Sequence, residues 1–235
     1  MQRIATFEPD IIKHFVRDVD DTLVRNSMKI KNQVWEEIFP DRLEEIRLVN
    51  RMFDKDGPFP NGSYHQGDRY ERVAYMLGKW EPNDKYYRKD AKVVELVDKF
   101  NTKVKNKIKA MGVHADDMLS LQEIKKKFPV AQFYVVSNVP EEVLINDLSK
   151  YGILDMFVKA IGTPTSKVEA LEKIIKEHKC KHENVIMIGD GNNDYQAALE
   201  VGTQFVGIRA GKNSIWDSSA TTCNHLADLS NLFKK

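Results

Sequence analysis

The sequence predicts an α/β protein whose parallel sheet is interrupted, after its first strand, by a separate helical unit. Strand and helix signals alternate at short spacing from residue 131 to residue 208, which is typical of βαβ units. Residues 24–118 instead show helix-like apolar spacing and few strand signals. About 90 consecutive residues of this kind favour an inserted unit with its own core. Acidic residues follow two of the predicted strands, at Asp18 and Asp190.

The composition allows a core domain with a smaller appendage and argues against two classes of partner. The chain has 235 residues, of which 42% are hydrophobic and 30% charged. Its net charge of +1 offers no electrostatic footprint for nucleic acid or for an anionic membrane. The apolar runs are far shorter than the ~20 residues of a membrane helix, and the start lacks the blocks of a secretory signal. We therefore expect neither a nucleic-acid nor a membrane partner.

The two cysteines, Cys180 and Cys223, show no metal-like spacing. We interpret both as reduced thiols in a cytoplasmic protein, with a disulfide between them as the less favoured alternative.

Five strands and three helices are predicted in the core. The strands lie at residues 11–17, 131–136, 157–161, 185–188 and 205–208. The helices lie at residues 141–151, 167–178 and about 194–201, and Gly202 can end the last of them. In such sheets ligands bind beyond the carboxyl ends of the strands, so Asp18 and Asp190 can meet there.

The first strand is unusually polar for a buried parallel strand, because it contains Lys13, His14 and Arg17. We expect polar groups to cover part of one face; a role for Arg17 as an anion contact is the less favoured alternative. Five of the six histidines, at 14, 114, 178, 182 and 225, suggest no ligand cluster.

The inserted unit is predicted to contain helices at 68–77 and 90–110, separated from earlier helical segments by a loop over 54–67 with three glycines and two prolines. Its large aromatic residues are expected to form the unit's own core rather than a substrate cage. They are Trp35, Phe39, Tyr75 and Trp80.

The segment from Asp18 to Thr22 places three carboxylates and a hydroxyl within five residues, directly after a strand. Phosphoryl transfer needs a nucleophile, neutralisation of the phosphoryl oxygens and a proton source. A carboxylate can be that nucleophile, through an acyl phosphate that water later cleaves. The alternative is a turn with solvated carboxylates and no chemistry.

Three later segments carry groups that suit the same chemistry. Ser137 and Asn138 follow a strand and can contact phosphate, although a helix cap is the favoured role for Ser137 when this segment is taken alone. Lys167 opens a helix, where a cation is unfavourable without an anionic partner; the alternative is a surface lysine. The segment GDGNND at 189–194 offers hard oxygen ligands for Mg²⁺. It lacks the closing Glu of an EF-hand and the G-K-[ST] of a phosphate loop.

Taken in order, D-x-D-x-T at 18–22, Ser137, Lys167 and GDGNND at 189–194 resemble the four signatures of the haloacid dehalogenase (HAD) superfamily. Its members mostly transfer phosphoryl groups through an aspartyl intermediate. The resemblance implies a Rossmann-like, doubly wound parallel sheet formed by residues 1–24 and 119–235. It also implies that residues 25–118 are an all-helical C1-type cap.

The resemblance further implies roles for single residues. Asp18 would be the nucleophile, Asp20 the general acid and base, and Lys167 a catalytic cation. Phosphate contacts would come from Thr22, Ser137, Asn138 and Lys167. A Mg²⁺ ion would be held by Asp18, the backbone carbonyl of Asp20, Asp190 and, in support, Asp194.

From this we expect a Mg²⁺-dependent phosphatase for a small phosphorylated metabolite, such as phosphoglycolate or a sugar phosphate. Asp20 argues against a dehalogenase, because halide leaves without a proton. A phosphomutase, a phosphonate hydrolase and a non-catalytic binding protein of the same fold remain alternatives. Candidate substrate-reading residues are Arg25, the Tyr64–His65 loop, Arg69 and Arg72. The natural substrate and the oligomeric state stay open.

Overall fold

The computed structural model describes residues 6–53, 68–81, 85–111, 113–209, 216 and 220–233. The chain divides into two compact units. The first, here the core unit, comprises Met1–Ser27 and Met111–Lys235; the second, here the cap unit, comprises Met28–Ala110. The first division lies three residues from the expected boundary at 24/25, and the second lies eight residues before the expected boundary at 118/119. The Tyr64–His65 loop falls outside the described residues.

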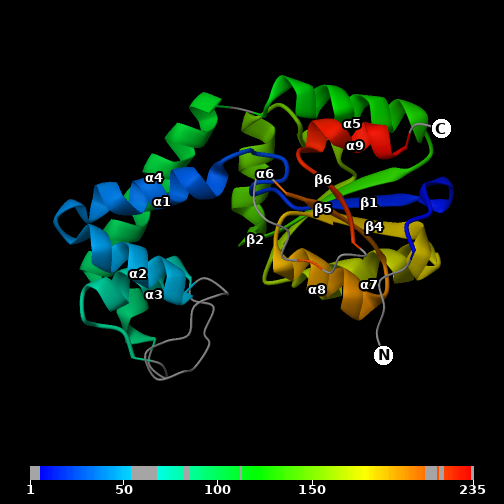
Figure 1. Ribbon diagram of the computed structural model, residues 1–235. Helices are drawn as coiled ribbons and strands as arrows, with labels where there is room; N and C mark the ends of the chain where they lie inside the picture. Colours follow the sequence, from blue (N-terminus) through cyan, green and yellow to red (C-terminus); the bar gives the residue numbers. More distant parts are fainter. Residues whose placement is uncertain are drawn as a thin grey trace. The chain divides into compact units, whose positions relative to one another are not determined.

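The core unit contains a parallel sheet of six strands in the order β3-β2-β1-β4-β5-β6 (Figure 1). The strands are β1 His14–Arg17, β2 Gln132–Pro140, β3 Lys159–Thr163, β4 Val185–Gly189, β5 Gln204–Ile208 and β6 Thr221–Cys223. This confirms the predicted parallel sheet. The sequence did not indicate β6, which has only three residues, and the expected start of β1 is instead a 3₁₀ turn at Pro9–Ile11.

Helices cover both faces of the sheet, which confirms the doubly wound α/β class (Figure 1). On one face lie α7 (Lys167–His178) and α8 (Asn192–Val201), and on the other lie α5 (Ala115–Lys127) and the short α9 (Leu229–Leu232). Helix α6 (Glu141–Lys150) follows β2 and packs against β2 and β3. Predicted and observed helices agree within two residues at 141–151, 167–178 and 194–201.

The side chains of β1 alternate between two different environments. Val16 belongs to the apolar cluster under α7 and α8, with Leu171, Ile174 and Ala198. Phe15 points to the other face, where its ring stacks on Phe133 with centroids 4.9 Å apart. Burial of these side chains from water is what holds helices on both faces of the sheet.

Arg17 shares the face of Phe15 and is fully buried. Its guanidinium carbon lies 5.4 Å from the ring centroid of Phe133 and 5.9 Å from that of Phe15, within cation–π range. Its nitrogens have no hydrogen-bond partner among the described residues, and burial lowers the Arg17 pKa to about 9. The guanidinium of Arg17 is thus packed against aromatic side chains.

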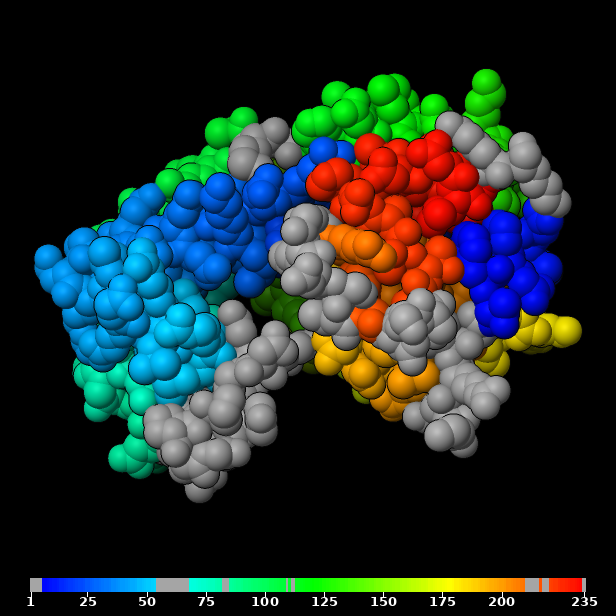
Figure 2. Space-filling view, in the orientation of Figure 1, coloured from blue at the N-terminus to red at the C-terminus, as the bar shows by residue number. Residues whose placement is uncertain are grey.

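The two ends of the described chain lie together. The ring centroids of Phe7 and Phe233 are 5.7 Å apart, and Phe233 also meets Phe15 and Phe128. Figure 2 shows the first residues, in dark blue, beside the last, in red. This contact closes the core unit although the cap unit separates its two chain segments.

The cap unit is helical throughout its described residues. Its helices are α1 (Ser27–Ile38), α2 (Leu43–Phe53), α3 (Arg69–Met76) and α4 (Ala91–Met111). Trp35 and Phe39 are buried, and the Trp35 ring stacks on Phe100 with centroids 3.8 Å apart. Tyr75 and Trp80 also contact one another and Phe53, so the aromatic residues form the core of the cap unit, as expected. In the described part of the chain, no helix combines the length and apolarity needed for a membrane span.

A buried ion pair ties the segment after β1 to helix α5, within the core unit. Arg25 donates from Nε and Nη2 to the two carboxylate oxygens of Asp117, each at 2.7 Å. Asp117 is fully buried and accepts a third bond, from the backbone N–H of Ala227 at 2.8 Å. Arg25, a candidate for reading substrate, therefore has a structural partner.

We predict that Arg25→Met lowers the free energy of unfolding of the core unit by about 3 kcal/mol, because it leaves the buried Asp117 carboxylate without its counter-charge. Urea denaturation measures the loss. Lys181→Met is the matched control: its ion pair with Glu183 is exposed, so it should cost under about 1 kcal/mol. Equal losses in the two variants would contradict the assignment.

Candidate active site

The chain leaves β1 at Asp18 and turns back on itself at once. The Asp18 N–H extends the sheet ladder by donating to Ile188 O at 2.9 Å. The next residues form a tight loop, in which the N–H groups of Leu23 and Val24 both donate to Val19 O. Asp21 adopts a positive φ of 53°, a conformation that Asp tolerates better than most residues. This loop holds Asp20 and Thr22 close to the end of the strand.

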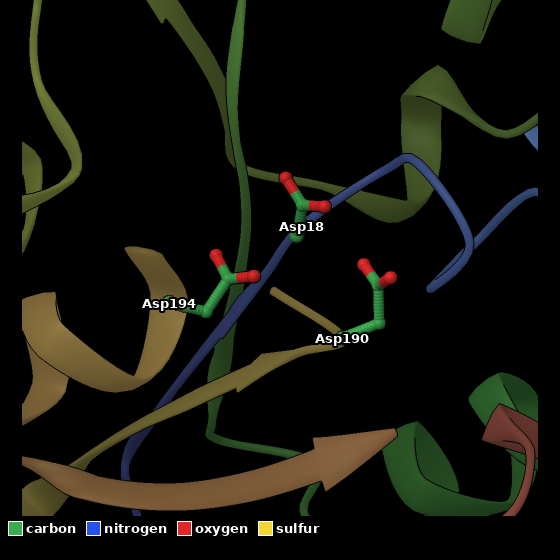
Figure 3. A group of neighbouring side chains, drawn as sticks. All are labelled: Asp18, Asp190 and Asp194. Atoms are coloured by element: carbon green, nitrogen blue, oxygen red, sulfur yellow. The ribbon is translucent and has the colours of Figure 1, made fainter. Parts of the chain in front are cut away.

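Strand register brings the two acidic segments together. Arg17 pairs with Ile188 of β4, so Asp18 and Asp190 both lie just past neighbouring strand ends. Asp194 joins them from the first turn of α8, and one carboxylate oxygen of each residue lies within 4.8 Å of the others. Figure 3 shows the three carboxyl groups pointing the same way from β1, β4 and α8. The expected meeting of Asp18 and Asp190 is therefore observed.

The approach of Asp194 depends on a glycine. A Cβ at Gly189 would lie 2.2 Å from Cγ of Asp194, so any other residue there would displace this carboxylate. The Gly191 N–H donates to Asp194 Oδ2 at 3.0 Å, which fixes its orientation at the start of α8.

The ammonium of Lys167 lies between Asp18 and Asp194, two members of the acidic group. Its ammonium donates to Asp18 Oδ1 at 2.7 Å and also to Oδ1 of Asp194. The side chain is only 6% exposed, so the alternative of a surface lysine is wrong. Burial lowers the Lys167 pKa, but Asp18 and Asp194 together raise it above its usual value. These carboxylates are the anionic partners that a cation at a helix N-terminus requires.

The site carries more negative than positive charge. Burial raises the pKa of Asp18, and Asp194, Asp190 and Asp20 raise it further, while Lys167 opposes them. One ammonium cannot neutralise this many carboxylates in a buried place. A hard divalent cation among the carboxylate oxygens would lower their mutual repulsion, and oxygen atoms are the ligands that Mg²⁺ prefers. The residues present thus fit such a cation.

The candidate phosphate contacts lie at the same edge of the sheet. Thr22 is buried, and its hydroxyl lies 3.5 Å from Asp190 Oδ1. Ser137 is also buried, two residues beyond Val135, the partner of Arg17 in β2. Its hydroxyl accepts from the Val139 N–H at 3.2 Å. Asn138 is exposed.

The helix-cap interpretation of Ser137 is wrong. Strand β2 continues to Pro140, and Pro140 is the N-cap of α6, with no side-chain cap bond. Ser137 thus lies within an extended segment at the carboxyl end of β2.

Two supporting residues were not found from the sequence. Ser27 accepts from the Asp21 N–H at 3.0 Å and donates to Asp21 Oδ1, which braces the loop after β1. Tyr151 ends α6, and burial raises its pKa, with further contributions from Asp147 and Asp20. Only the fold brings this phenol near Asp20, so no local pattern could have indicated it.

Two cap candidates have partners inside the cap unit. Arg69 donates to Asn101 Oδ1 at 2.6 Å, with its guanidinium 5.4 Å from the Phe100 ring centroid. Arg72 donates to Asn50 Oδ1 at 3.1 Å. Both side chains thus have a structural role in the cap unit.

Comparison with curated proteins finds partial relatives. The chain is 30% identical over 99 residues to the phosphoglycolate phosphatase of Vibrio vulnificus strain YJ016, which covers 40% of this chain and 43% of that protein. A second relative, from Vibrio cholerae, is 31% identical over 84 residues, covering 34% and 37%. The chain thus matches less than half the length of these relatives.

Solved structures resemble the whole chain. A predicted phosphoglycolate phosphatase from Haemophilus somnus aligns with a TM-score of 0.62 and 16% identity, covering 95% of this chain and 99% of that one. A putative beta-phosphoglucomutase from Thermotoga maritima gives 0.63 and 12%, covering 94% and 98%. At such identities the likeness shows the fold.

The family comparison agrees with the four converging segments. The family model described as "haloacid dehalogenase-like hydrolase" matches residues 12–202, most of the chain. That range includes Asp18, Ser137, Lys167 and Asp190. The chain belongs to the haloacid dehalogenase-like hydrolase family.

Proposed function

We propose that this protein is a Mg²⁺-dependent phosphatase that hydrolyses a small phosphorylated metabolite through an aspartyl-phosphate intermediate. The observation that carries the proposal is the cluster of Asp18, Asp190 and Asp194, in which the buried Asp18 and Asp194 both bind the ammonium of Lys167. The Vibrio relatives, named as phosphoglycolate phosphatases, support a phosphoglycolate-like or sugar-phosphate-like substrate.

Asp18 is the proposed nucleophile. Lys167 binds its Oδ1, so we assign Oδ2 to attack on phosphorus. The P–O bond to the leaving group breaks as the bond to Oδ2 forms, and Asp20 gives its proton to the departing oxygen. Asp20 then takes a proton from the water that attacks phosphorus. This step releases inorganic phosphate and restores the Asp18 carboxylate.

Mg²⁺ would be held by Asp18, Asp190 and the backbone carbonyl of Asp20, and it would supply neutralisation of the phosphoryl oxygens. Asp194 supports the site by holding Lys167 and the Gly191 N–H. We assign the remaining phosphate contacts to Lys167, Thr22, Ser137 and Asn138.

We further propose that residues 25–118 act as a C1-type cap that selects the substrate; this range contains the cap unit.

Cys180 and Cys223 are both free, which supports a reducing compartment such as the cytoplasm.

Asp18→Asn should reduce the hydrolysis of p-nitrophenyl phosphate about 10³-fold or more, because an amide is a poor nucleophile. The assay is run with and without Mg²⁺, beside Asp155→Asn, which changes an exposed carboxylate of the core unit. Circular dichroism checks the fold of both. Wild-type protein that is inactive with every divalent metal would favour a non-catalytic role, and full activity of Asp18→Asn would rule out this nucleophile.

Asp190→Asn should raise the Mg²⁺ concentration needed for half-maximal activity by about tenfold or more, since it removes one charged ligand. The same variant should lose most of the increase in melting temperature that Mg²⁺ gives the wild type. Thermal unfolding thus tests metal binding without turnover. An unchanged metal titration in both assays would count against Asp190 as a ligand.

Asp20→Asn should reduce the rate by an amount that depends on the leaving group of the substrate. For an alkyl ester such as phosphoglycolate, the loss in kcat should be about 10²–10⁴-fold, because the alkoxide needs a proton. p-Nitrophenolate leaves without one, so its formation should fall much less. Burst kinetics with p-nitrophenyl phosphate isolate this first step. Equal losses for both leaving groups would contradict the role of Asp20 as general acid.

A further inference from the structure

A pocket opens at the opposite end of the sheet from the acidic group. Its volume is about 350 Å³, and it is lined at the amino-terminal ends of β1 and β2 and by the end of α7. His14 begins β1, and Asp18 follows four residues later, a distance of about 13 Å along the strand. The pocket is large enough for a small ligand and separate from the proposed catalytic residues.

The lining of this pocket is basic. It contains Lys13, His14, His178 and Lys179, and no acidic side chain occurs among its described lining residues. His178 and Lys179 stand at the C-terminal end of α7, where positive charge complements the helix dipole. Lys13 directly precedes β1 and His14 begins it, and no helix dipole accounts for basic side chains there.

The two imidazoles lie against each other. Their ring centroids are 4.5 Å apart, at an interplanar angle of 32°. Tyr134 donates its hydroxyl proton to Gln132 Oε1 at 2.7 Å, so His178 Nε2, 2.8 Å away, serves as donor to the Tyr134 oxygen. His14 is 5% exposed, and its Nδ1 has no hydrogen-bond partner among the described residues.

Burial and positive neighbours both favour the neutral form of the His14 ring. Burial lowers its pKa to about 4, helped by His178 and Lys13 and opposed by a bond to Gln132. The other groups facing this region are the Lys179 ammonium, the Cys180 thiol and, beyond Tyr134, Glu177, which lies 3.9 Å from Lys173. An anion between the bases would remove the repulsion that opposes protonation.

We propose that this pocket binds a small oxyanion of the phosphate type, and that the protein takes up a proton as the anion binds. A metal ion is a poorer fit, because the only acidic, histidine or cysteine group with metal-ligand spacing among the described residues is Asp18, Asp190 and Asp194. Because a bound anion favours the protonated imidazole, protonation must in turn raise the affinity for the anion, so the anion should bind more tightly at low pH.

Sulfate is the sharpest probe, because it stays a dianion between pH 5.5 and pH 8. The full chain is titrated with sulfate at constant ionic strength, with chloride as the reference, while NMR follows the Cε1–Hε1 signals of the histidines. We expect His14 and His178 to shift in a saturable way, with sulfate on the order of tenfold tighter at pH 5.5 than at pH 8.

Lys13→Gln combined with Lys179→Gln should weaken binding at least about tenfold without changing the fold, which the NMR spectrum reports. The matched control is Lys126→Gln with Lys127→Gln, two exposed lysines of α5 on the other face of the sheet (Figure 1). Titrations with phosphate and methylphosphonate distinguish the two possible ligands. Tighter binding of phosphate indicates that the pocket takes the free ion, and tighter binding of methylphosphonate indicates that it takes an organic phosphate.

Three results would overturn the proposal. They are the absence of saturable shifts at His14 and His178, equal sulfate affinity at the two pH values, and equal affinity in the two double variants. Because the readout is binding at these histidines, the outcome does not depend on whether the protein is a phosphatase.

Discussion

The buried contact of Lys167 with Asp18 and Asp194 is the interaction on which the site depends. It joins three segments that are distant in the sequence: the end of β1, the start of α7 and the first turn of α8. Each partner is almost fully buried, so loss of one would leave a charge without compensation, at a cost of about 3–5 kcal/mol. The same contact places an ammonium beside the carboxylate that we propose as nucleophile. The two bonds of Lys167 therefore stabilise the fold and also position the proposed catalytic residues.

The sheet supplies the second constraint. β1 lies between β2 and β4, with Arg17 paired to Val135 on one side and Ile188 on the other. Asp18, Ser137 and Asp190 therefore lie at the same edge of the sheet, at or just past the carboxyl ends of their strands, where parallel α/β folds bind ligands. Relatives of the same fold carry different names, among them a putative beta-phosphoglucomutase. Function must therefore be argued from the side chains at this edge rather than from the fold.

Local sequence patterns predicted the fold and the site more successfully than any inference about contacts between distant residues. The acidic segment after β1, the glycines and acids after β4 and the helix start at Lys167 are local signals, and each predicted where its residues lie in the fold. Contacts made only by the tertiary structure were not predictable. No local pattern indicates that Arg25 reaches Asp117 or that the ring of His14 lies against His178. The end of β2 was also predicted wrongly: the polar pair Ser137 and Asn138 suggests that the strand ends at residue 136, but β2 continues to Pro140.

The most direct test of the account is to trap the covalent intermediate. An acyl phosphate on Asp18 is an activated carboxyl group, which borohydride reduces to the alcohol, so residue 18 would become homoserine. Protein quenched during turnover, reduced and digested, is read by mass spectrometry. The account predicts homoserine at position 18 only when both Mg²⁺ and substrate are present. Homoserine at another aspartate, or at none while turnover proceeds, would contradict it.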